Sequence, residues 1–298
     1  MTTWESQLQP MPNALTTTGR ILHGTVIERP DVRVDSFNDH WLVQTKNGDL
    51  PNEFRNITPR LARSVWWKKL DKDAKSAPEW VEGEKLSAPF PVKENDANYL
   101  IDFAAGYSQG LFLDQRLNRD KLREKIQAGD RVLNCFAYTC SFSVVTAQAG
   151  GIATSMDLSP RYLEWGKENF RLNQLEPDDH FFCKGDVMDW LKRFAKQGRT
   201  FRGVILDPPT FSRNGKKIFK VENDYTELVR LAASVLDKSG GWLLCSTNHH
   251  NLHPWQFEPM LCEGVDLAER HVKNVKTSPM PPEFDGDDYL KSFWLDVE

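Results

Sequence analysis

The chain has 298 residues, 40% of them hydrophobic and 27% charged, and its formal net charge at pH 7 is −4. This length allows two domains, and the composition is that of an ordinary globular protein. The overall basic excess of many nucleic-acid-binding proteins is missing, so any contact with nucleic acid must depend on local patches. No apolar run approaches the about 20 residues of a membrane-spanning helix, which argues against a membrane protein of that kind.

Residues 1–20 are polar, with no basic segment before an apolar one, and predict a flexible tail without a secretory signal. The cysteines lack CxxC spacing, and most lie in or beside apolar runs, where a reduced cysteine acts as a small hydrophobe. We therefore expect a reduced, cytoplasmic protein with no metal site. The cysteines are Cys135, Cys140, Cys183, Cys245 and Cys262.

Residues 21–119 are predicted to form a small β-rich domain that ends in a hairpin and a loop. Strands are expected at Ile21–Ile27 and Trp41–Thr45, and a hairpin over residues 89–103. Between them, Arg63–Lys69 places two tryptophans among cations, a pattern that can contact nucleic acid by stacking and charge. The favoured interpretation is a pair of core tryptophans with solvated lysines. This region does not clearly resemble an RNA-binding module.

Residues 120–298 alternate between apolar strands and helices, a pattern that builds a parallel sheet with helices on both faces. The last two strands have no long helix between them and are expected to pair antiparallel at the sheet edge. The expected strands cover residues 131–136, 152–157, 180–184, 203–207, 241–246, 267–276 and 289–297. The expected helices cover residues 141–149, 160–173, 187–196, 225–236 and 254–262.

Ligands bind such sheets where the strands end at their carboxyl edge. The loop after the first of these strands, residues 134–142, contains no glycine, so the pyrophosphate fingerprint of a nicotinamide cofactor is missing. The methionine end of S-adenosylmethionine tolerates other loops. Asp157 follows the second strand and suits either ribose hydroxyls or a turn beside a helix dipole. Asp186 follows the third and suits either the adenine amine, with Val187 against the ring, or a helix cap.

The segment after the fourth strand, Asp207–Ser212, is the most informative in the chain. Its two consecutive prolines, Pro208 and Pro209, fix the backbone directly after a buried strand. Phe211 then supplies an aromatic ring that can stack on a flat base. We interpret this segment as a place that holds a planar acceptor beside a methyl donor, rather than as a plain turn.

Three segments together resemble the large-subunit ribosomal RNA methyltransferase K/I family of class I S-adenosylmethionine-dependent enzymes. They are Gly110–Arg116, Val132–Thr139 and Asp207–Ser212. The resemblance runs from about Pro89 to the end of the chain. It implies a Rossmann-like, doubly wound sheet of seven strands with the last pair antiparallel, S-adenosylmethionine as cofactor and RNA as partner.

The resemblance also implies roles for individual residues. Asp114 and Arg116 would lie in a loop over the cofactor, Asp157 would hold the ribose, and Asp186 would meet the adenine. The substrate side would comprise Asp207, Pro208, Pro209, Phe211 and Asn248, with Asp207 also near the cofactor. The methionine and ribose part of the cofactor would be lined by Asn134, Phe136, Tyr138 and Ser141.

Two departures from the family pattern bear on function. Cys140 stands where members usually carry glycine, and its side chain would either crowd the cofactor or pack away from it. Members that methylate carbon 5 of cytosine resemble enzymes with a nucleophilic cysteine after the fifth strand. Asn248 stands at that place, whereas Cys245 lies inside the strand. Asn248, together with Thr210–Ser212 after the two prolines, looks more like the K-type branch of the family. That resemblance implies N7 of a guanine in 23S ribosomal RNA as the favoured acceptor, an atom that is already nucleophilic and needs only orientation.

Other features and functions stay open at this stage. Arg213, Lys216, Lys217 and Lys220 suit either RNA phosphates or a solvated loop. The cluster His249, His250 and His253 lacks a carboxylate or cysteine that would complete a metal site. The alternatives are a methyltransferase for a small molecule or a protein, and a non-catalytic module that binds the cofactor or RNA. The sequence leaves open whether the protein is a monomer or a homodimer.

Overall fold

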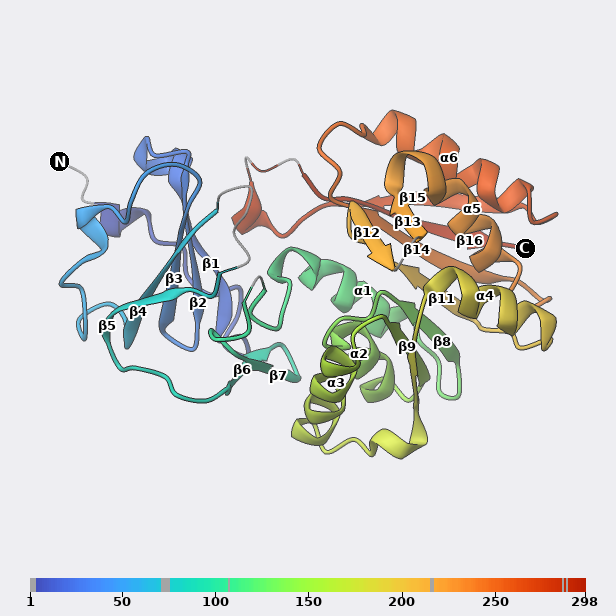
Figure 1. Cartoon of the computed structure of the whole chain (residues 1–298), viewed down its shortest axis with the longest axis horizontal. Coiled ribbons are helices and arrows are strands. Elements are labelled where there is room, and N and C mark those ends of the chain that lie inside the picture. Colours follow the sequence, from blue (N-terminus) through green and yellow to red (C-terminus); the bar gives the residue numbers. More distant parts are fainter. Residues whose placement is uncertain (1–3, 71–75, 107, 215–216, 286, 288) are drawn as a thin grey trace. The chain divides into compact units, whose positions relative to one another are not determined.

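The computed structural model describes residues 4–70, 76–106, 108–214, 217–285, 287 and 289–298. The chain forms two compact units (Figure 1). The first comprises Met1–Arg116 and Pro281–Asp287, and the second comprises Leu117–Met280 and Asp288–Glu298. Within the described residues, no helix is both long and apolar enough to span a membrane.

The first unit is built on a five-stranded sheet in the order β1-β2-β3-β4-β5. Only β3 and β4 pair in parallel, and the other neighbours are antiparallel. The hairpin that the sequence predicted is present as β6 with β7, and its turn is shorter than expected, because Glu94 and Ala97 pair as the last residues of the two strands. The strands are β1 (Thr18–His23), β2 (Val32–Phe37), β3 (His40–Thr45), β4 (Ser64–Lys69), β5 (Glu79–Gly83), β6 (Phe90–Glu94) and β7 (Ala97–Ile101).

The tryptophans of β4 belong to the first unit's sheet and make internal hydrogen bonds. Trp66 is buried and its Nε1 donates to Ser64 Oγ at 3.0 Å, while Trp67 Nε1 donates to Thr45 Oγ1 at 3.1 Å. Lys68 is also buried, and its Nζ donates to the carbonyl of Gly106 at 3.0 Å. The core interpretation of the tryptophans is confirmed, but the expectation that both lysines are solvated is wrong for Lys68.

The segment Pro281–Asp287 belongs to the first unit, although it connects two strands of the second unit's sheet. Arg20, itself buried, binds Asp35 at 2.9 Å and Asp287 at 2.8 Å, and its guanidinium lies 4.1 Å from the centre of the Phe284 ring. Arg116 forms a second buried pair with Glu283. Buried charges persist only when they are paired, so these contacts fix the segment to the first unit.

The amino-terminal segment begins with a 3-10 helix, Trp4–Gln7. The ring of Trp4 packs against Trp41 and Phe54, with centroid distances of 6.4 and 5.0 Å. β1 then starts at Thr18, inside the stretch for which the sequence predicted a tail. Residues 4–20 therefore contribute side chains to the core of the first unit.

The second unit contains a seven-stranded sheet in the order β10-β9-β8-β11-β14-β16-β15, with β16 antiparallel to both neighbours. The doubly wound fold with a closing antiparallel pair is thus confirmed. Its strands are β8 (Arg131–Cys135), β9 (Ile152–Asp157), β10 (Phe181–Lys184), β11 (Gly203–Leu206), β14 (Gly241–Thr247), β15 (Val272–Ser278) and β16 (Lys291–Val297).

Helices cover both faces of this sheet, and each face has its own core. One core joins the sheet to α4 and α5 and to α6, and the other joins it to α1 and α2. Alternate residues of a strand serve opposite cores: Leu133 faces the first and Val132 the second. The helices are α1 (Arg116–Lys125), α2 (Ser141–Gln148), α3 (Pro160–Leu172), α4 (Val187–Lys196), α5 (Val221–Ala233) and α6 (Pro254–Asp266).

Several elements differ from the sequence expectation. The strand expected over residues 21–27 ends at His23, because a 3-10 helix, Gly24–Ile27, follows it. Residues 267–271 turn instead of extending, so β15 begins only at Val272. The hairpin of β12 (Phe211–Asn214) and β13 (Lys217–Lys220) was expected as a basic loop, since its strands carry charges and no apolar alternation.

Candidate functional site

The sheet reverses its winding between β8 and β11, which are parallel neighbours. β8 continues outward to β9 and β10, whereas β11 continues the other way to β14. This is the switch point at which open α/β sheets form a crevice at the carboxyl ends of their strands. The residues that follow β8, β9, β10, β11 and β14 therefore define the candidate site.

The loop after β8 has an unusual backbone. Phe136, Tyr138 and Cys140 all have positive φ angles, 60°, 49° and 63°, although none is glycine. Such conformations cost free energy and persist where surrounding contacts impose them. Here the Ala137 N–H donates to the carbonyl of Met156 at 2.8 Å, which ties the loop to β9. The loop is therefore a fixed shape, as a binding surface requires.

Asp157, at the end of β9, holds two turns at once. Its Oδ2 accepts the Tyr138 N–H at 2.9 Å, and its Oδ1 accepts the Ser159 N–H at 2.8 Å. Burial raises the pKa of the Asp157 carboxyl, and the backbone donors oppose that shift. Each carboxylate oxygen can accept a further hydrogen bond, so the ribose role predicted for Asp157 is compatible with these contacts.

Cys140 points away from the loop surface and into the protein. Its side chain is fully buried, and a β-carbon placed on Gly166 of α3 would overlap its sulfur. Burial raises the pKa of the Cys140 thiol to about 12, so it stays protonated at neutral pH. Of the two alternatives left by the sequence, packing away from the cofactor is the one that the structure supports.

Asn134 is buried, and its Nδ2 donates to Ser143 Oγ at 2.9 Å. Ser143 Oγ contacts Ser155 Oγ at 2.8 Å, so these polar groups join β8 and α2 to β9 below the loop. Ser141 is the first residue of α2 and is half-buried. Phe136 and Tyr138 are also half-buried, and the Tyr138 ring lies 4.5 Å from that of Tyr162.

The turn after β10 caps a helix and also leaves a carboxylate oxygen at the sheet edge. Gly185 has a φ of 143°, and a β-carbon there would come 2.9 Å from Trp190 Nε1. Asp186 Oδ1 accepts the Asp189 N–H at 3.2 Å, so the predicted cap of α4 is confirmed. Val187 is buried and contributes to the core.

The exit of β11 is rigid and anchored from below. Asp207 is half-buried, Pro208 is buried, and Pro209 is exposed. The fully buried Tyr225 of α5 places its hydroxyl 3.0 Å from the carbonyl of Leu206 and 2.9 Å from that of Ser246. A single side chain thus links the ends of β11 and β14, a contact that the sequence did not predict.

The loops after these two strands also touch. The Thr210 hydroxyl donates to Asn248 Oδ1 at 2.9 Å, which leaves the amide N–H groups of Asn248 available to a ligand. The backbone of Phe211 begins β12, while its side chain lies outside the described part of the structure. Cys245 is fully buried, and burial raises the pKa of its thiol.

Asp114 and Arg116 belong to the first unit, in and beside the 3-10 helix Leu113–Gln115. Asp114 is half-buried, and Arg116 is committed to its pair with Glu283. Their role over the cofactor therefore stays a prediction.

The basic and histidine-rich segments beside the site both contact acidic residues of α5. The backbone N–H of Lys220 donates to Asp224 Oδ2 at 2.7 Å, and the side-chain Nε2 of His249 lies 3.1 Å from Glu222 Oε1. The side chains of Arg213 and Lys217, and all of Lys216, lie outside the described residues. In the described part of the chain, no group of three or more His, Cys, Asp or Glu side chains is placed to hold a metal ion.

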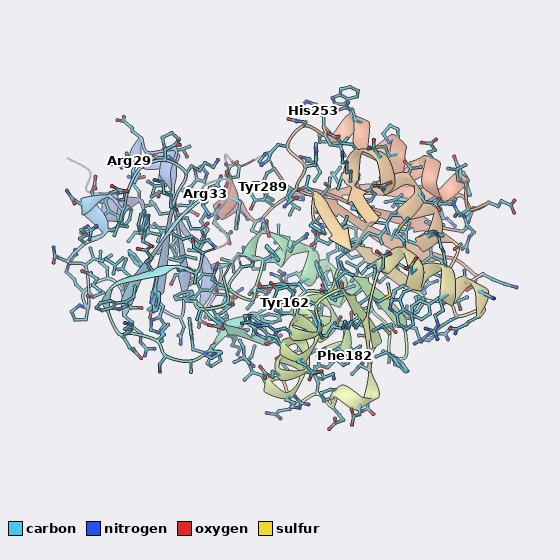
Figure 2. All side chains as sticks on the ribbon, in the orientation of Figure 1. Arg29, Arg33, Tyr162, Phe182, His253 and Tyr289 are labelled. Carbon is cyan, nitrogen blue, oxygen red and sulfur yellow. The ribbon has the colours of Figure 1, made fainter. Side chains whose placement is uncertain are left out.

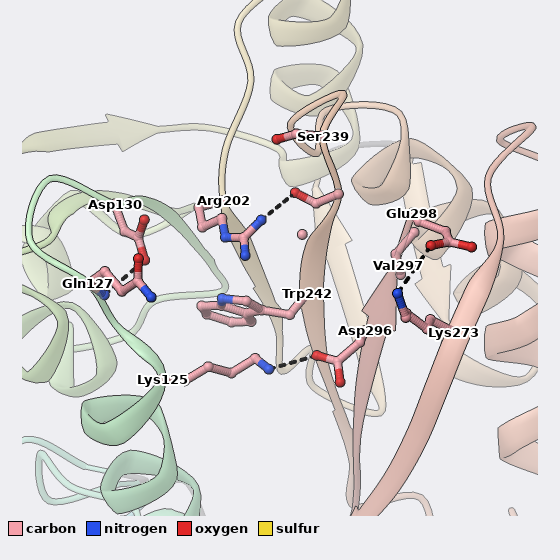
Figure 3. Close-up of a pocket in the computed structure, with 12 residues that line it drawn as sticks. Lys125, Gln127, Asp130, Arg202, Ser239, Trp242, Lys273, Asp296, Val297 and Glu298 are labelled. Carbon is pink, nitrogen blue, oxygen red and sulfur yellow. Dashed lines mark hydrogen bonds and ion pairs between the residues drawn. The ribbon is translucent and has the colours of Figure 1, made fainter.

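A cavity of about 390 Å³ lies at the opposite edge of the sheet (Figure 3). Its lining includes Asp130, Arg202 and Gly241, which immediately precede or begin β8, β11 and β14. Its cations are largely paired within it: Lys125 binds Asp296 at 2.7 Å and Lys273 approaches Glu298 at 3.5 Å. This cavity is separate from the candidate site, because it opens at the amino ends of the strands.

The carboxyl edge as described fits the adenosine end of S-adenosylmethionine. Adjacent strands β9 and β10 end in two carboxylates, Asp157 and Asp186, which can accept hydrogen bonds from hydroxyl and amine groups. Gly185, directly before Asp186, donates its N–H to the carbonyl of Asp157 at 2.9 Å and so joins the two strand ends. When bound, the cofactor supplies an electrophilic methyl group.

Comparisons with known proteins agree with this geometry. The sequence model of the S-adenosylmethionine-dependent methyltransferase family matches residues 63–294. A protein of Legionella pneumophila named ribosomal RNA large subunit methyltransferase K/L is 36% identical over 252 residues, which cover 79% of this chain and 34% of that protein. A Methanocaldococcus jannaschii protein, named provisionally as a ribosomal RNA large subunit methyltransferase, is 31% identical over 89% of this chain and 71% of its own length.

Solved structures lead to the same class. A protein described provisionally as a methyltransferase and crystallised with SAH superposes with a TM-score of 0.85 and 28% identity, over 96% of this chain and 76% of that one. The strand order and the site at the switch point are those of a cofactor-dependent α/β enzyme. The chain belongs to the S-adenosylmethionine-dependent methyltransferase family. It spans about a third of the length of the first curated relatives it matches, 34% of the Legionella protein.

Proposed function

We propose that the chain methylates a base of large-subunit ribosomal RNA, and that the acceptor is N7 of guanine rather than carbon 5 of cytosine. The names of relatives at 36% and 31% identity support the RNA. A single structural observation supports the nitrogen acceptor: near the end of β14 the exposed position is Asn248, while Cys245 is fully buried.

Carbon methylation requires a nucleophile that adds to the ring and a base that later removes a proton. A buried thiol with a raised pKa supplies neither a thiolate nor access to the ring. The N7 atom already carries a lone pair and no proton, so it attacks the methyl carbon directly. On accepting the methyl group, the base would gain a positive charge, and the donor would leave as a neutral thioether. Orientation and charge stabilisation are then the main requirements.

The chain's own residues would meet these requirements as follows. Pro208 and Pro209 fix the backbone after β11, and the Asp207 carboxylate would stabilise the charge that develops on the base. The Asn248 amide, held by Thr210, would donate to an acceptor atom of the base. The carbonyl O6 of guanine can accept this hydrogen bond, whereas the exocyclic amine of cytosine is itself a donor.

The test is transfer of a labelled methyl group to unmodified large-subunit ribosomal RNA, followed by mass spectrometry of the nucleosides. We expect 7-methylguanosine, and we expect Asp207→Asn to reduce its rate of formation. Asp130→Asn, at the opposite edge of the sheet, is the matched control and should leave the rate unchanged. Label on carbon 5 of cytosine would contradict the proposed acceptor. Turnover on a metabolite or a protein, with none on RNA, would contradict the proposed substrate.

A further inference from the structure

A pair of aromatic rings lies at the start of α6, on the loop that leaves the carboxyl end of β14. The rings of His253 and Trp255 are stacked, with an interplanar angle of 7° and centroids 6.1 Å apart. His253 is labelled in Figure 2 at the amino end of α6. Trp255 is 72% exposed, the largest exposure among the large hydrophobic side chains of the described residues.

The ring pair is held by an ordered backbone. The His253 N–H donates to Gln256 Oε1 at 3.1 Å, and the His253 carbonyl accepts the N–H groups of Gln256 and Phe257, both at 3.0 Å. Pro254 fixes the first position of the helix, and Leu252 before it is buried. An exposed tryptophan on a fixed backbone loses little conformational entropy when a ligand covers it.

The position of the pair ties it to the acceptor side of the site. Only four residues lie between Asn248 and His253, and the Leu252 N–H donates to the carbonyl of His249, which folds this short loop back on itself. His250, in the same loop, has its ring 6.3 Å from that of Tyr289. The aromatic groups therefore follow directly from the strand end that carries Asn248.

The charges around the pair distinguish base contact from phosphate contact. α6 contains Glu258, Glu263 and Asp266 but no lysine or arginine. The helix therefore offers a phosphate no cationic side chain, whereas the flat face of any base can stack on an aromatic ring. A base that enters the methylation site must leave its own stack, and its neighbours then need new stacking partners.

Resting on the proposed function, we infer that the His253–Trp255 pair is a stacking platform for a nucleobase that flanks the methylated one in single-stranded RNA. Trp255 provides the surface, and His253 backs it. The platform would strengthen RNA binding without touching the cofactor, because its exposed face belongs to α6 rather than to the ends of β9 and β10.

The experiment is steady-state methylation of unmodified large-subunit ribosomal RNA, transcribed in vitro, by the full chain and its variants. We expect Trp255→Ala to raise the KM for RNA about tenfold to a hundredfold, the range that the loss of one stacked base produces. We expect Trp255→Phe to retain most of the affinity, and calorimetry to give both variants the Kd of the unaltered protein for S-adenosylmethionine. Leu267→Ala, at the other end of α6 and 55% exposed, is the matched control and should change nothing.

The salt dependence separates stacking from charge. The ratio of KM values between Trp255→Ala and the unaltered protein should stay constant as salt rises, since stacking releases no counterions. An unchanged KM in Trp255→Ala, or a difference that disappears at high salt, would overturn the platform while leaving the proposed function intact. If the unaltered protein methylates no ribosomal RNA, the proposed function falls, and the platform falls with it. If the Trp255→Ala chain fails to fold, His253→Ala replaces it in the test. We expect His253→Ala to raise the KM for RNA by a smaller factor.

Discussion

The sulfur of Cys140 occupies the space that a β-carbon on Gly166 would need, so the loop after β8 and helix α3 fit together through one large and one small residue. Cys140 has a left-handed backbone and is fully buried, which explains how a loop without glycine takes this shape. Without space at residue 166, the thiol would have to move toward the loop surface, where the cofactor is proposed to bind.

Gly166→Ala should therefore destabilise the protein and weaken cofactor binding together. Overpacking of a core costs about 1–3 kcal/mol. Cys140→Gly should tolerate that alanine, because it removes the sulfur and accepts a positive φ. We expect the double variant to recover most of the unfolding free energy lost in Gly166→Ala, as measured by urea denaturation. If the losses of unfolding free energy in the two single variants simply add in the double variant, the two residues do not share this space.

The Tyr225 hydroxyl leads to a second prediction. Tyr225→Phe removes the group that lies between the carbonyls of Leu206 and Ser246, with little change in volume. We expect a loss of about 1–3 kcal/mol in unfolding free energy, the usual cost of leaving buried polar groups without a partner. Because the ends of β11 and β14 carry Asp207 and Asn248, we also expect a lower kcat with an unchanged Kd for S-adenosylmethionine. A stability loss at full kcat would limit Tyr225 to a structural role.

A third prediction concerns the orientation of Asn248. Thr210→Val has nearly the same shape but cannot hold Asn248 Oδ1, whereas Thr210→Ser keeps the hydroxyl. We expect Thr210→Val to lower kcat/KM for RNA several-fold, and Thr210→Ser to stay close to the unaltered protein, since a net hydrogen bond is worth about 1 kcal/mol. Equal effects of the two variants would show that the methyl group of Thr210 matters and the hydrogen bond does not.

The second unit was predictable from the sequence because its buried parallel strands are continuous apolar runs between clear helix signals. Ser159 and Pro160, for example, mark the start of α3, and the Ser159 hydroxyl accepts the Tyr162 N–H as a cap. In the first unit, the sequence did not predict β2, β4 or β5 as strands. β2 carries Asp35 and Arg33 as internal ion-pair partners, and β5 is mostly exposed, so neither shows a clean apolar alternation.

At the site, the sequence identified positions but not contacts. Asp157 and Asp186 could be proposed as site residues because strand ends in such a sheet converge on one edge. The contacts of Tyr225 with two strand ends, of Thr210 with Asn248 and of Cys140 with Gly166 join residues that are 19 to 38 positions apart. These depend on the packing of α5, of α3 and of two loops, which one sequence cannot fix. An isolated tyrosine on an apolar helix face was the available signal for Tyr225.

A fourth prediction tests the proposed ribose contact. Asp157→Asn keeps the size of the side chain but replaces one carboxylate oxygen with a donor. We expect the Kd for S-adenosylmethionine to rise about 10- to 100-fold, since hydrogen bonds to a charged group contribute about 1.5–3 kcal/mol. Calorimetry measures this directly, with Asp130→Asn as the control at the opposite edge. Asp157 also holds the turns at Tyr138 and Ser159, so distortion of these turns can account for part of the loss of cofactor affinity. The melting temperature is therefore measured as well. An unchanged Kd would remove Asp157 from the cofactor site.

The last prediction concerns the acid side of the stability profile. His180 Nδ1 accepts the Ala153 N–H at 3.1 Å, which requires a neutral ring, and burial lowers the pKa of His180 below its ordinary 6.5 against an opposing effect of Asp179. The unfolded chain therefore binds this proton more readily than the folded one. The contribution of His180 to the free energy of unfolding is complete above about pH 6.5 and is lost as the pH falls toward the lowered pKa.

His180→Asn offers an acceptor that does not titrate. Urea denaturation between about pH 7 and about pH 5 should show a shallower loss of stability in this variant, with a remainder from His40, whose pKa burial also lowers. Parallel profiles for the two proteins would mean that protonation of His180 is not linked to unfolding.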